Sequence, residues 1–244
     1  MAMMLGLSGG TGAWNPKALD ATFWLRGDLG VTQSSNAISA WADQSVNGIT
    51  VTQGTAGAKP TYSATGGPNN KPCVTFDGGD TLTALTIAQT TVFGASAGTV
   101  GIVMNPTGGT GGVIPCMWYQ TVNSNNMYLY LNTASNTIKF EYGDDTNGNS
   151  TSTLMTVDAW HYYVITCVNS TTHTAFKDGV ADGNSPFTVT SSVLSSANGT
   201  IDIGSYGGAV AFTGAIAEIV WFKTALGTAD GTALGDYFAA RYGL

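Results

Sequence analysis

The chain is 244 residues long; 43% of its residues are hydrophobic, only 9% are charged, and the formal net charge is −7. A typical soluble domain carries roughly 25% charged residues, so the polar surface must consist largely of uncharged side chains, which favours an extracellular or virion protein over a cytosolic enzyme. The eight Lys and Arg residues are scattered singly. Without a basic patch to neutralise phosphates we expect no nucleic-acid partner. No apolar run approaches the roughly 18 residues of a membrane-spanning helix, so no membrane partner is expected either.

The first segment in chain order, residues 1–13, reads MAMMLGLSGGTGA. It lacks the basic region and the apolar core of a signal peptide. Five of its first seven residues are Met or Leu, and a glycine-rich spacer follows. Because such a stretch is too apolar to stay in water and too short to form a core, we expect an arm that orders against another virion protein or a second copy of the chain. Residues 14–244 are expected to form a single domain.

Alternation with a period of two dominates the rest of the chain and predicts β-strands. In residues 126–132, NMYLYLN, the residues Met127, Leu129 and Leu131 alternate with Tyr128 and Tyr130. Residues 160–168, WHYYVITCV, are apolar at nearly every position. This second pattern is expected for a central strand that is covered on both faces.

A tight hairpin is predicted at residues 176–180, FKDGV. Asp178 and Gly179 tolerate the positive φ angles that a type I′ turn requires. The strands on either side of this turn are therefore expected to pair directly.

Only the C-terminal tail has a helical pattern. We expect a short helix that begins at Thr228 as N-cap and ends at Gly243. Apolar residues recur there at spacings of three and four, and the helix is expected to dock on the sheet through Leu234, Phe238 and Tyr242.

The order of these segments resembles laminin-G-like, concanavalin A-like lectin domains of the kind found in bacteriophage structural proteins. The segments that carry the resemblance are FWLRGDLGV, AWADQSVNG, PCVTFDGGDTL, AWHYYVITC, AFKDGVADG, GTIDIGSY and FTGAIAEIVWF with the tail that follows. The resemblance covers roughly residues 14–244, and in 95–150 it depends on the strand pattern alone. It implies an all-β, two-sheet antiparallel jelly-roll sandwich with adjacent first and last strands and a short C-terminal helix. It also implies a role in binding, often to glycans and often with a calcium ion at the rim.

Calcium is the one cofactor that the sequence leaves open. Asp43 and Asn47 in ADQSVNG, and Asp77 and Asp80 in FDGGD, offer the oxygen ligands that calcium prefers. The same residue types also make turns by bonding to their own backbone. Because no run of alternating acids is present, we favour turn residues over calcium ligands at both places.

A set of aromatic residues forms the candidate carbohydrate site. Tyr128 and Tyr130 share one face of a predicted amphipathic strand, and other aromatic residues could extend them into a platform on which sugar rings stack. The full set is Trp118, Tyr119, Tyr128, Tyr130 and Tyr206. The alternative is ordinary cross-strand packing.

No catalytic set is apparent. Retaining glycosidases need two carboxyl groups about 5 Å apart, and the only glutamates are Glu141 and Glu218, far apart in sequence. Glu218 lies in an apolar strand, so its carboxylate must be paired or hydrogen-bonded, and we expect it to accept bonds from the backbone or from a Trp or Tyr donor. His161 and His173 have no accompanying nucleophile motif. We therefore expect a protein that is not an enzyme.

The three cysteines, Cys73, Cys116 and Cys167, lie in apolar strand-like runs without metal or disulfide spacing. Cysteine in such a setting behaves as a small buried hydrophobe. We expect three free, buried thiols.

These observations favour a non-enzymatic bacteriophage virion protein, a capsid decoration or fibre-type module, with surface glycan binding as an additional activity. The alternative is a bacterial secreted or cell-surface carbohydrate-binding module. A polysaccharide-degrading enzyme ranks below both. The expected location is the virion or, on the alternative, the bacterial exterior.

Overall fold

A computed structural model gives the backbone of residues 14–107, 113–119, 125–132, 137–144, 153–154, 157–169, 172–183, 185–188, 198–206 and 210–244. Side chains are described within these ranges except between 113 and 154, where only that of Leu129 is described, and at 187, 206 and 210–211. The predicted arm, residues 1–13, lies outside the described residues.

The first sheet is built around β20 (Thr213–Phe222). One edge of β20 pairs with β8 (Gly98–Pro106), and the other is shared by β6 (Cys73–Asp77) and β1 (Phe23–Arg26). Beyond β8 the sheet continues through β13 (His161–Cys167), β14 (Thr172–Lys177), and the short strands β15 (Val180–Ala181) and β16 (Phe187–Thr188). The pairing of β1 with β20 confirms that the first and last strands are adjacent.

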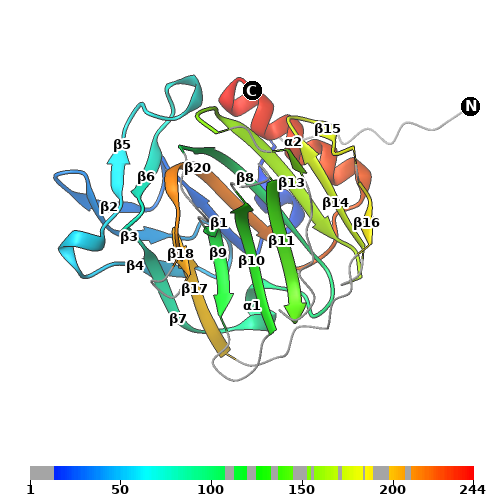
Figure 1. The fold of residues 1–244 in the computed structure, drawn as a ribbon, viewed down its shortest axis with the longest axis horizontal. Helices are drawn as coiled ribbons and strands as arrows, with labels where there is room; N and C mark the ends of the chain where they lie inside the picture. Colours follow the sequence, from blue (N-terminus) through cyan, green and yellow to red (C-terminus); the bar gives the residue numbers. More distant parts are fainter. Residues whose placement is uncertain are drawn as a thin grey trace, which may run out of the picture.

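The second sheet faces the first. In order it contains β2 (Val31–Ser34), β3 (Ala37–Ala42), β4 (Thr50–Thr52), β7 (Leu82–Ala88), β17 (Asn198–Ile203), β9 (Val113–Tyr119), β10 (Asn125–Asn132), β11 (Thr137–Asp144) and β12 (Thr153–Leu154). β5 (Thr61–Ser63) pairs with β3 and β6 and so joins the two sheets, while β18 (Ser205–Tyr206) and β19 (Val210–Ala211) form a separate ribbon. All these pairings are antiparallel, which confirms the predicted two-sheet sandwich (Figure 1).

The hydrophobic core lies between the sheets. Side chains of β13 alternate between this core and the opposite, outer face of the first sheet: Tyr163 and Ile165 belong to the core, whereas Tyr162 and Val164 belong to a second apolar cluster. Leu129 of β10 closes the core from the second sheet and is fully buried. The prediction that residues 160–168 form a central strand covered on both faces is therefore confirmed.

Helix α2 (Thr228–Tyr242) covers the outer face of the first sheet (Figure 1). Leu234, Phe238 and Tyr242 are at most 2% exposed, as predicted. The helix approaches β8 closely at Gly101, where an added Cβ atom would lie 2.8 Å from the ring of Phe238. This glycine lets the helix lie directly on the sheet.

The helix ends as predicted, but its N-cap differs from the prediction. Gly243 adopts the left-handed conformation (φ 68°), and its N–H donates to the carbonyl of Ala239. The N-cap is Gly227, whose backbone is extended, and Thr228 is the first helical residue. The first turn therefore has no side-chain cap, because its N-cap residue is a glycine.

The predicted hairpin is present at the end of β14. Asp178 and Gly179 have φ angles of 49° and 76°, and Lys177 pairs with Val180 across the two-residue turn. The short helices α1 (Gln89–Val92), η1 (Pro16–Leu19), η2 (Ala56–Ala58) and η3 (Pro68–Asn70) were not predicted.

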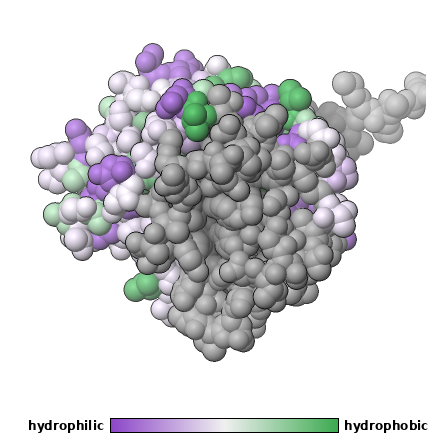
Figure 2. Space-filling view, in the orientation of Figure 1, coloured by the Kyte–Doolittle hydropathy of each residue, from purple (hydrophilic) through white to green (hydrophobic). Residues whose placement is uncertain are grey.

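Cys73 and Cys167 are free and buried, as predicted, and burial raises the pKa of the Cys73 thiol to about 11. The side chain of Cys116 lies outside the described residues. No helix in the described ranges is long and apolar enough to cross a membrane. On the described part of the face in Figure 2, apolar residues are scattered among polar ones.

Candidate functional site

Asp43 and Asn47, the first pair of predicted calcium ligands, fasten a turn to β1. One carboxylate oxygen of Asp43 accepts the backbone N–H groups of Trp24 and Ser45, each at 2.7 Å, and the other accepts the Ser45 hydroxyl at 2.6 Å. The amide of Asn47 donates to the carbonyl of Thr22 at 2.7 Å. Both side chains therefore face hydrogen-bond partners of the turn, the arrangement expected of turn residues.

The second predicted pair makes the turn after β6. Asp80 accepts the N–H of Asp77 at 2.9 Å, Asp77 accepts the N–H of Gly79 at 2.8 Å, and Gly78 has a φ of 95°. Burial, with the neighbouring Asp77, raises the pKa of Asp80 to about 6. Asp80 lies within the turn, because β7 begins only at Leu82.

Among the described residues, no three His, Cys, Asp or Glu side chains gather into a set that could hold a metal ion. Calcium can also take backbone and amide oxygens. A calcium ion at either turn therefore stays a prediction.

The side chains of the predicted aromatic platform lie outside the described residues: Trp118, Tyr119, Tyr128, Tyr130 and Tyr206. Their backbone positions are described. Tyr128 pairs with Met117, whereas Trp118 pairs with the buried Ile201. Successive strand positions alternate between the two faces, so Trp118 falls on the opposite face of the sheet from Tyr128. The platform as a whole stays a prediction.

Glu218 is the most deeply buried ionisable group of the α2 layer, with 0% exposure. One carboxylate oxygen accepts the indole N–H of Trp24 at 2.6 Å and the hydroxyl of Tyr237 at 2.9 Å, and the other accepts the hydroxyl of Tyr242 at 2.7 Å. The predicted Trp and Tyr donors are therefore confirmed. Burial raises the pKa of Glu218, and the three donors and Arg241 oppose that rise.

A β-bulge directs Glu218 toward the helix. Opposite β8, Ile216 pairs with Met104 and Glu218 pairs with Val103, so the intervening Ala217 is an extra residue in β20. A bulge re-aims the side chains that follow it. The two consecutive residues Ala217 and Glu218 consequently both contact the α2 layer.

Arg241 connects Glu218 to the surface. Its guanidinium lies 3.4 Å from the Glu218 carboxylate and 2.7 Å from Asp28, which also binds Arg26. Arg26 and Arg241 lower the pKa of Asp28, outweighing the effect of its partial burial. This chain of contacts ties β1, β20 and α2 together and leaves Glu218 inaccessible to a substrate.

The two histidines have structural environments. His161 Nδ1 lies 2.6 Å from Asp178, while its Nε2, which would have to take a proton from a nucleophile, is buried without a hydrogen-bond partner. His173 is fully buried, and burial lowers its pKa to about 4.

Two hollows lined by described residues flank α2. The larger, which we call the Trp14 pocket, has a volume of about 660 Å³. The half-buried rings of Trp14 and Tyr237 lie in it with their centroids 5.5 Å apart. Its lining residues are Trp14, Asn69, Lys71, Ala233, Asp236, Tyr237, Ala240 and Arg241.

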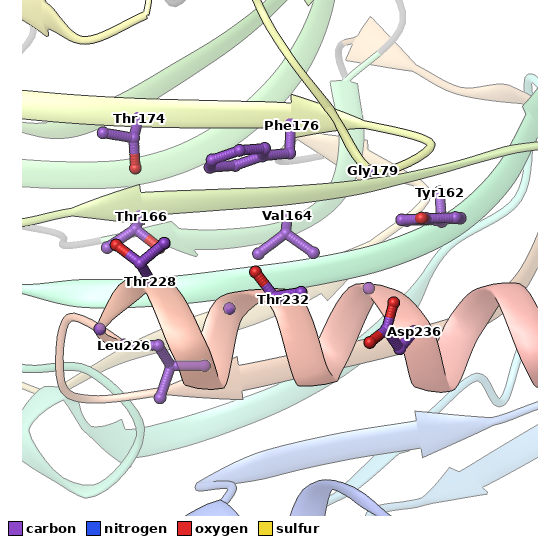
Figure 3. A pocket seen from close by; sticks show the side chains of 13 residues that line it. Tyr162, Val164, Thr166, Thr174, Phe176, Gly179, Leu226, Thr228, Thr232 and Asp236 are labelled. Atoms are coloured by element: carbon purple, nitrogen blue, oxygen red, sulfur yellow. The ribbon is translucent and has the colours of Figure 1, made fainter. Parts of the chain in front are cut away.

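The smaller hollow, which we call the helix groove, lies between α2 and the strands β13 and β14 and has a volume of about 190 Å³ (Figure 3). Its strand side carries Tyr162, Val164, Thr166, Thr174 and Phe176. Its helix side carries Gly227, Thr228, Gly231, Thr232, Gly235 and Asp236. Gly179 and Leu226 complete the lining.

The sequence analysis identified neither hollow. Trp14, Asn69 and Tyr237 are far apart in the sequence, so no local pattern joins them. One signal was available: the exposed positions of α2 from Thr228 to Ala240 carry only Thr, Ala and Asp. Longer helix formers such as Leu, Glu, Lys and Arg are usual at such positions.

Comparisons with known proteins agree with this fold. Domain 4 of AbnA, a GH43 extracellular arabinanase from Geobacillus stearothermophilus solved with arabinotriose, has a TM-score of 0.62 at 15% identity over 88% of this chain and 98% of that one. The binding domain of Paraclostridial Mosquitocidal Protein 1 gives 0.61 at 12% identity, covering 90% of this chain and 52% of that one. The Trypanosoma rangeli sialidase gives 0.57 at 12% identity, covering 89% of this chain and 33% of that one.

These identities are low, so the likeness concerns the fold alone. The neighbours include both binding domains and glycoside-cleaving enzymes. No curated protein matches the sequence. The family model of the concanavalin A-like lectin/glucanases superfamily matches residues 77–230, more than half of the chain. The chain is a member of this laminin-G-like, concanavalin A-like superfamily.

Proposed function

We propose that this protein is a non-enzymatic carbohydrate-binding module and that the Trp14 pocket is its glycan site. The observation that carries the proposal is the composition of this pocket, in which aromatic rings and planar polar groups meet in one open hollow. Ligand sites are typically hollows of about 300–1,000 Å³ with aromatic walls and a few convergent polar groups. The pocket has these properties.

The chemistry of the walls suits a sugar. The rings of Trp14 and Tyr237 offer apolar surface to the C–H face of a pyranose or furanose. Asn69 and Asp236 are exposed and offer an amide and a carboxylate to sugar hydroxyls. Arg241 is already held by Asp28 and Glu218, so it loses little freedom when a ligand binds.

The absence of catalysis is supported by Glu218. Its carboxylate has 0% exposure and contacts three donors and one cation. A general acid or base must come within hydrogen-bond reach of the proton that it transfers. Glu218 is therefore better placed to hold α2 and the pocket wall than to act on a glycan.

Two settings fit such a module. We favour a bacteriophage virion, as a capsid decoration or fibre-type protein, because the low charge and the uncharged polar surface suit an exterior particle protein. A secreted or cell-surface module is the alternative, and the structural similarity to a domain of an extracellular arabinanase favours it. Co-purification with phage particles would support the first setting.

A glycan array with the purified chain tests the proposed function, with arabinotriose included as one probe. We expect binding to at least one glycan and no release of reducing ends. Ala240→Leu places a larger side chain in the Trp14 pocket and should weaken binding to that glycan about tenfold or more. Ala229→Leu, at an exposed position of the same helix outside both hollows, is the matched control. Absence of any glycan hit would refute the proposal.

A further inference from the structure

The two hollows beside α2 are neighbours on the protein surface. Asp236 lines both of them, and Thr232 and Ala233, which follow each other in the helix, line one each. Only small side chains therefore stand between the Trp14 pocket and the helix groove. A ligand in the pocket can reach the groove by crossing the helix at Asp236.

The groove owes its space to glycines. Gly227, the N-cap of α2, and Gly231 and Gly235 within the helix recur every fourth residue and line the groove that faces β13 and β14. A Cβ atom at Gly227 or Gly231 would meet nothing within 4 Å, and one at Gly235 would make an ordinary 3.4 Å contact with the ring of Tyr162. The helix could therefore carry alanine at Gly231 or Gly235 without a clash, and alanine is the better helix former by about 1 kcal/mol.

The groove wall combines aromatic surface with hydroxyl groups. Figure 3 shows Phe176, Tyr162 and Thr166 on the strand side, and Thr228 at the N-terminal end of α2. Because the first turn of α2 has no side-chain cap, its N–H groups are further donors at that end.

The charge of the groove selects the chemical class of the occupant. Asp236 is the one charged residue among those that line it, and it repels an anion. Burial and the nearby Asp178 and Asp236 raise the pKa of Tyr162, so its hydroxyl stays a neutral donor. A ligand that is apolar on its faces, rich in hydroxyls and uncharged fits these walls.

We propose that the helix groove is a second subsite that binds one ring of a neutral oligosaccharide whose neighbouring ring occupies the Trp14 pocket. This inference depends on the proposed function, since it extends the glycan site across α2. With a volume of about 190 Å³, the groove is smaller than the usual range for drug-sized ligands and suits a single ring. The chain binds oligosaccharides of two or more units more tightly than the corresponding monosaccharide.

The test is a titration by calorimetry with the monomer, dimer and trimer of the neutral sugar that the glycan array selects. Wild-type protein should bind the trimer about tenfold or more tightly than the monomer. Gly231→Leu fills the groove and should reduce that ratio to about twofold or less, while the affinity for the monomer stays unchanged. Ala229→Leu adds the same side chain to the same helix outside both hollows and should keep the wild-type ratio. For an acidic sugar, the trimer should bind no more tightly than the monomer.

The outcomes separate the two proposals. If wild-type protein binds the glycan and Gly231→Leu keeps the full trimer-to-monomer ratio, the second subsite is refuted and the proposed function stands. If no sugar binds, both are refuted. Thermal unfolding checks that Gly231→Leu is folded, and we expect a melting temperature at or above that of wild type because a glycine has left the helix interior.

Discussion

The two faces of the first sheet differ in the side chains that they carry. The inner face contributes Ile102, Tyr163 and Ile219 to a continuous apolar core. The outer face, under α2, contains the buried carboxylate of Glu218 and borders two hollows. Both faces are covered, and the two hollows lie beside the helix that covers the outer one.

This difference separates the part of the molecule that stabilises the fold from the part that is a candidate for function. An apolar core stabilises the sandwich through the area that it removes from water. A buried carboxylate and glycines in a helix interior both lower stability unless something compensates. Local features that reduce stability tend to gather at functional sites, and here they gather around α2.

The largest effect is expected from a substitution that breaks the polar network around Glu218 on the outer face. Glu218→Ala removes the carboxylate that accepts from Trp24, Tyr237 and Tyr242 and one of the two carboxylates beside Arg241. We expect the free energy of unfolding to fall by about 3–5 kcal/mol, measured by urea denaturation. Glu218→Gln keeps one acceptor oxygen and should lose less. A loss below about 1 kcal/mol in Glu218→Ala would show that the network does not hold the helix.

The next effect concerns a polar residue of the inner face. Burial lowers the pKa of His173 to about 4, so the unfolded chain binds a proton at this residue at a higher pH than the folded chain. The stability that neutral His173 contributes is present above about pH 6.5 and is lost as the pH falls toward 4.

Between pH 6.5 and 5 the expected loss from His173 is about 2 kcal/mol. Urea denaturation at several pH values measures it, and His173→Gln should flatten this part of the profile. An identical pH profile for the variant would contradict the prediction.

Asp80, at the turn after β6, should change the stability with pH in the opposite direction to His173. Its folded-state pKa of about 6 lies above the usual value of an aspartate, so its contribution is most favourable at low pH and is lost as the pH rises through about 6. Solvent near the turn reduces the effect, and we expect about 1 kcal/mol. Asp80→Asn should be more stable than wild type at pH 7.5 and equal to it at about pH 3.5, below the pKa of an unfolded aspartate. Equal stability of the two proteins at both pH values would argue against the raised pKa.

A smaller effect sharpens the contrast at the helix groove. Gly231→Leu replaces a glycine within α2 and should raise the free energy of unfolding by about 0.5–1 kcal/mol. Ala229→Leu should change it by a few tenths of a kcal/mol at most. Chemical denaturation of the two variants checks this. A destabilised Gly231→Leu would mean that the groove is too narrow for an added side chain.

Calcium should have the smallest effect. The carboxylates of Asp43 and Asp80 accept N–H or O–H donors of their own turns, and Asp43 also accepts the N–H of Trp24 in β1. A ligand that binds only the folded state raises the melting temperature. We expect millimolar calcium to leave it unchanged relative to chelator. A clear rise would instead establish a calcium site.

The features of the fold that follow from local pattern could be predicted from the sequence. The period-two runs gave the strands, the Asp178–Gly179 pair gave the hairpin, and the spacing of Leu234, Phe238 and Tyr242 gave the docked face of α2. Each of these depends on residues close together in the chain. Their periodicity therefore contains the information needed to predict them.

The candidate site could not be predicted in the same way. The bulge at Ala217 directs Glu218 toward α2. It depends on the pairing of β20 with β8, so it cannot be recognised from the sequence of β20 alone. The Trp14 pocket joins three segments that meet only after the sandwich has formed. The aromatic pattern points to Tyr128 and Tyr130, whose side chains lie outside the described residues, so a platform there stays a prediction.

The most direct test of the central claim locates the glycan on the protein. Alanine methyl groups can be labelled with carbon-13 and followed by NMR while the glycan that the array selects is added. The account predicts that the methyl signals of Ala233 and Ala240, which line the Trp14 pocket, shift with saturating concentration dependence while that of Ala229 stays in place. Binding that leaves both pocket alanines unmoved would place the glycan elsewhere, for example on the strands β9 to β11, and would contradict the account.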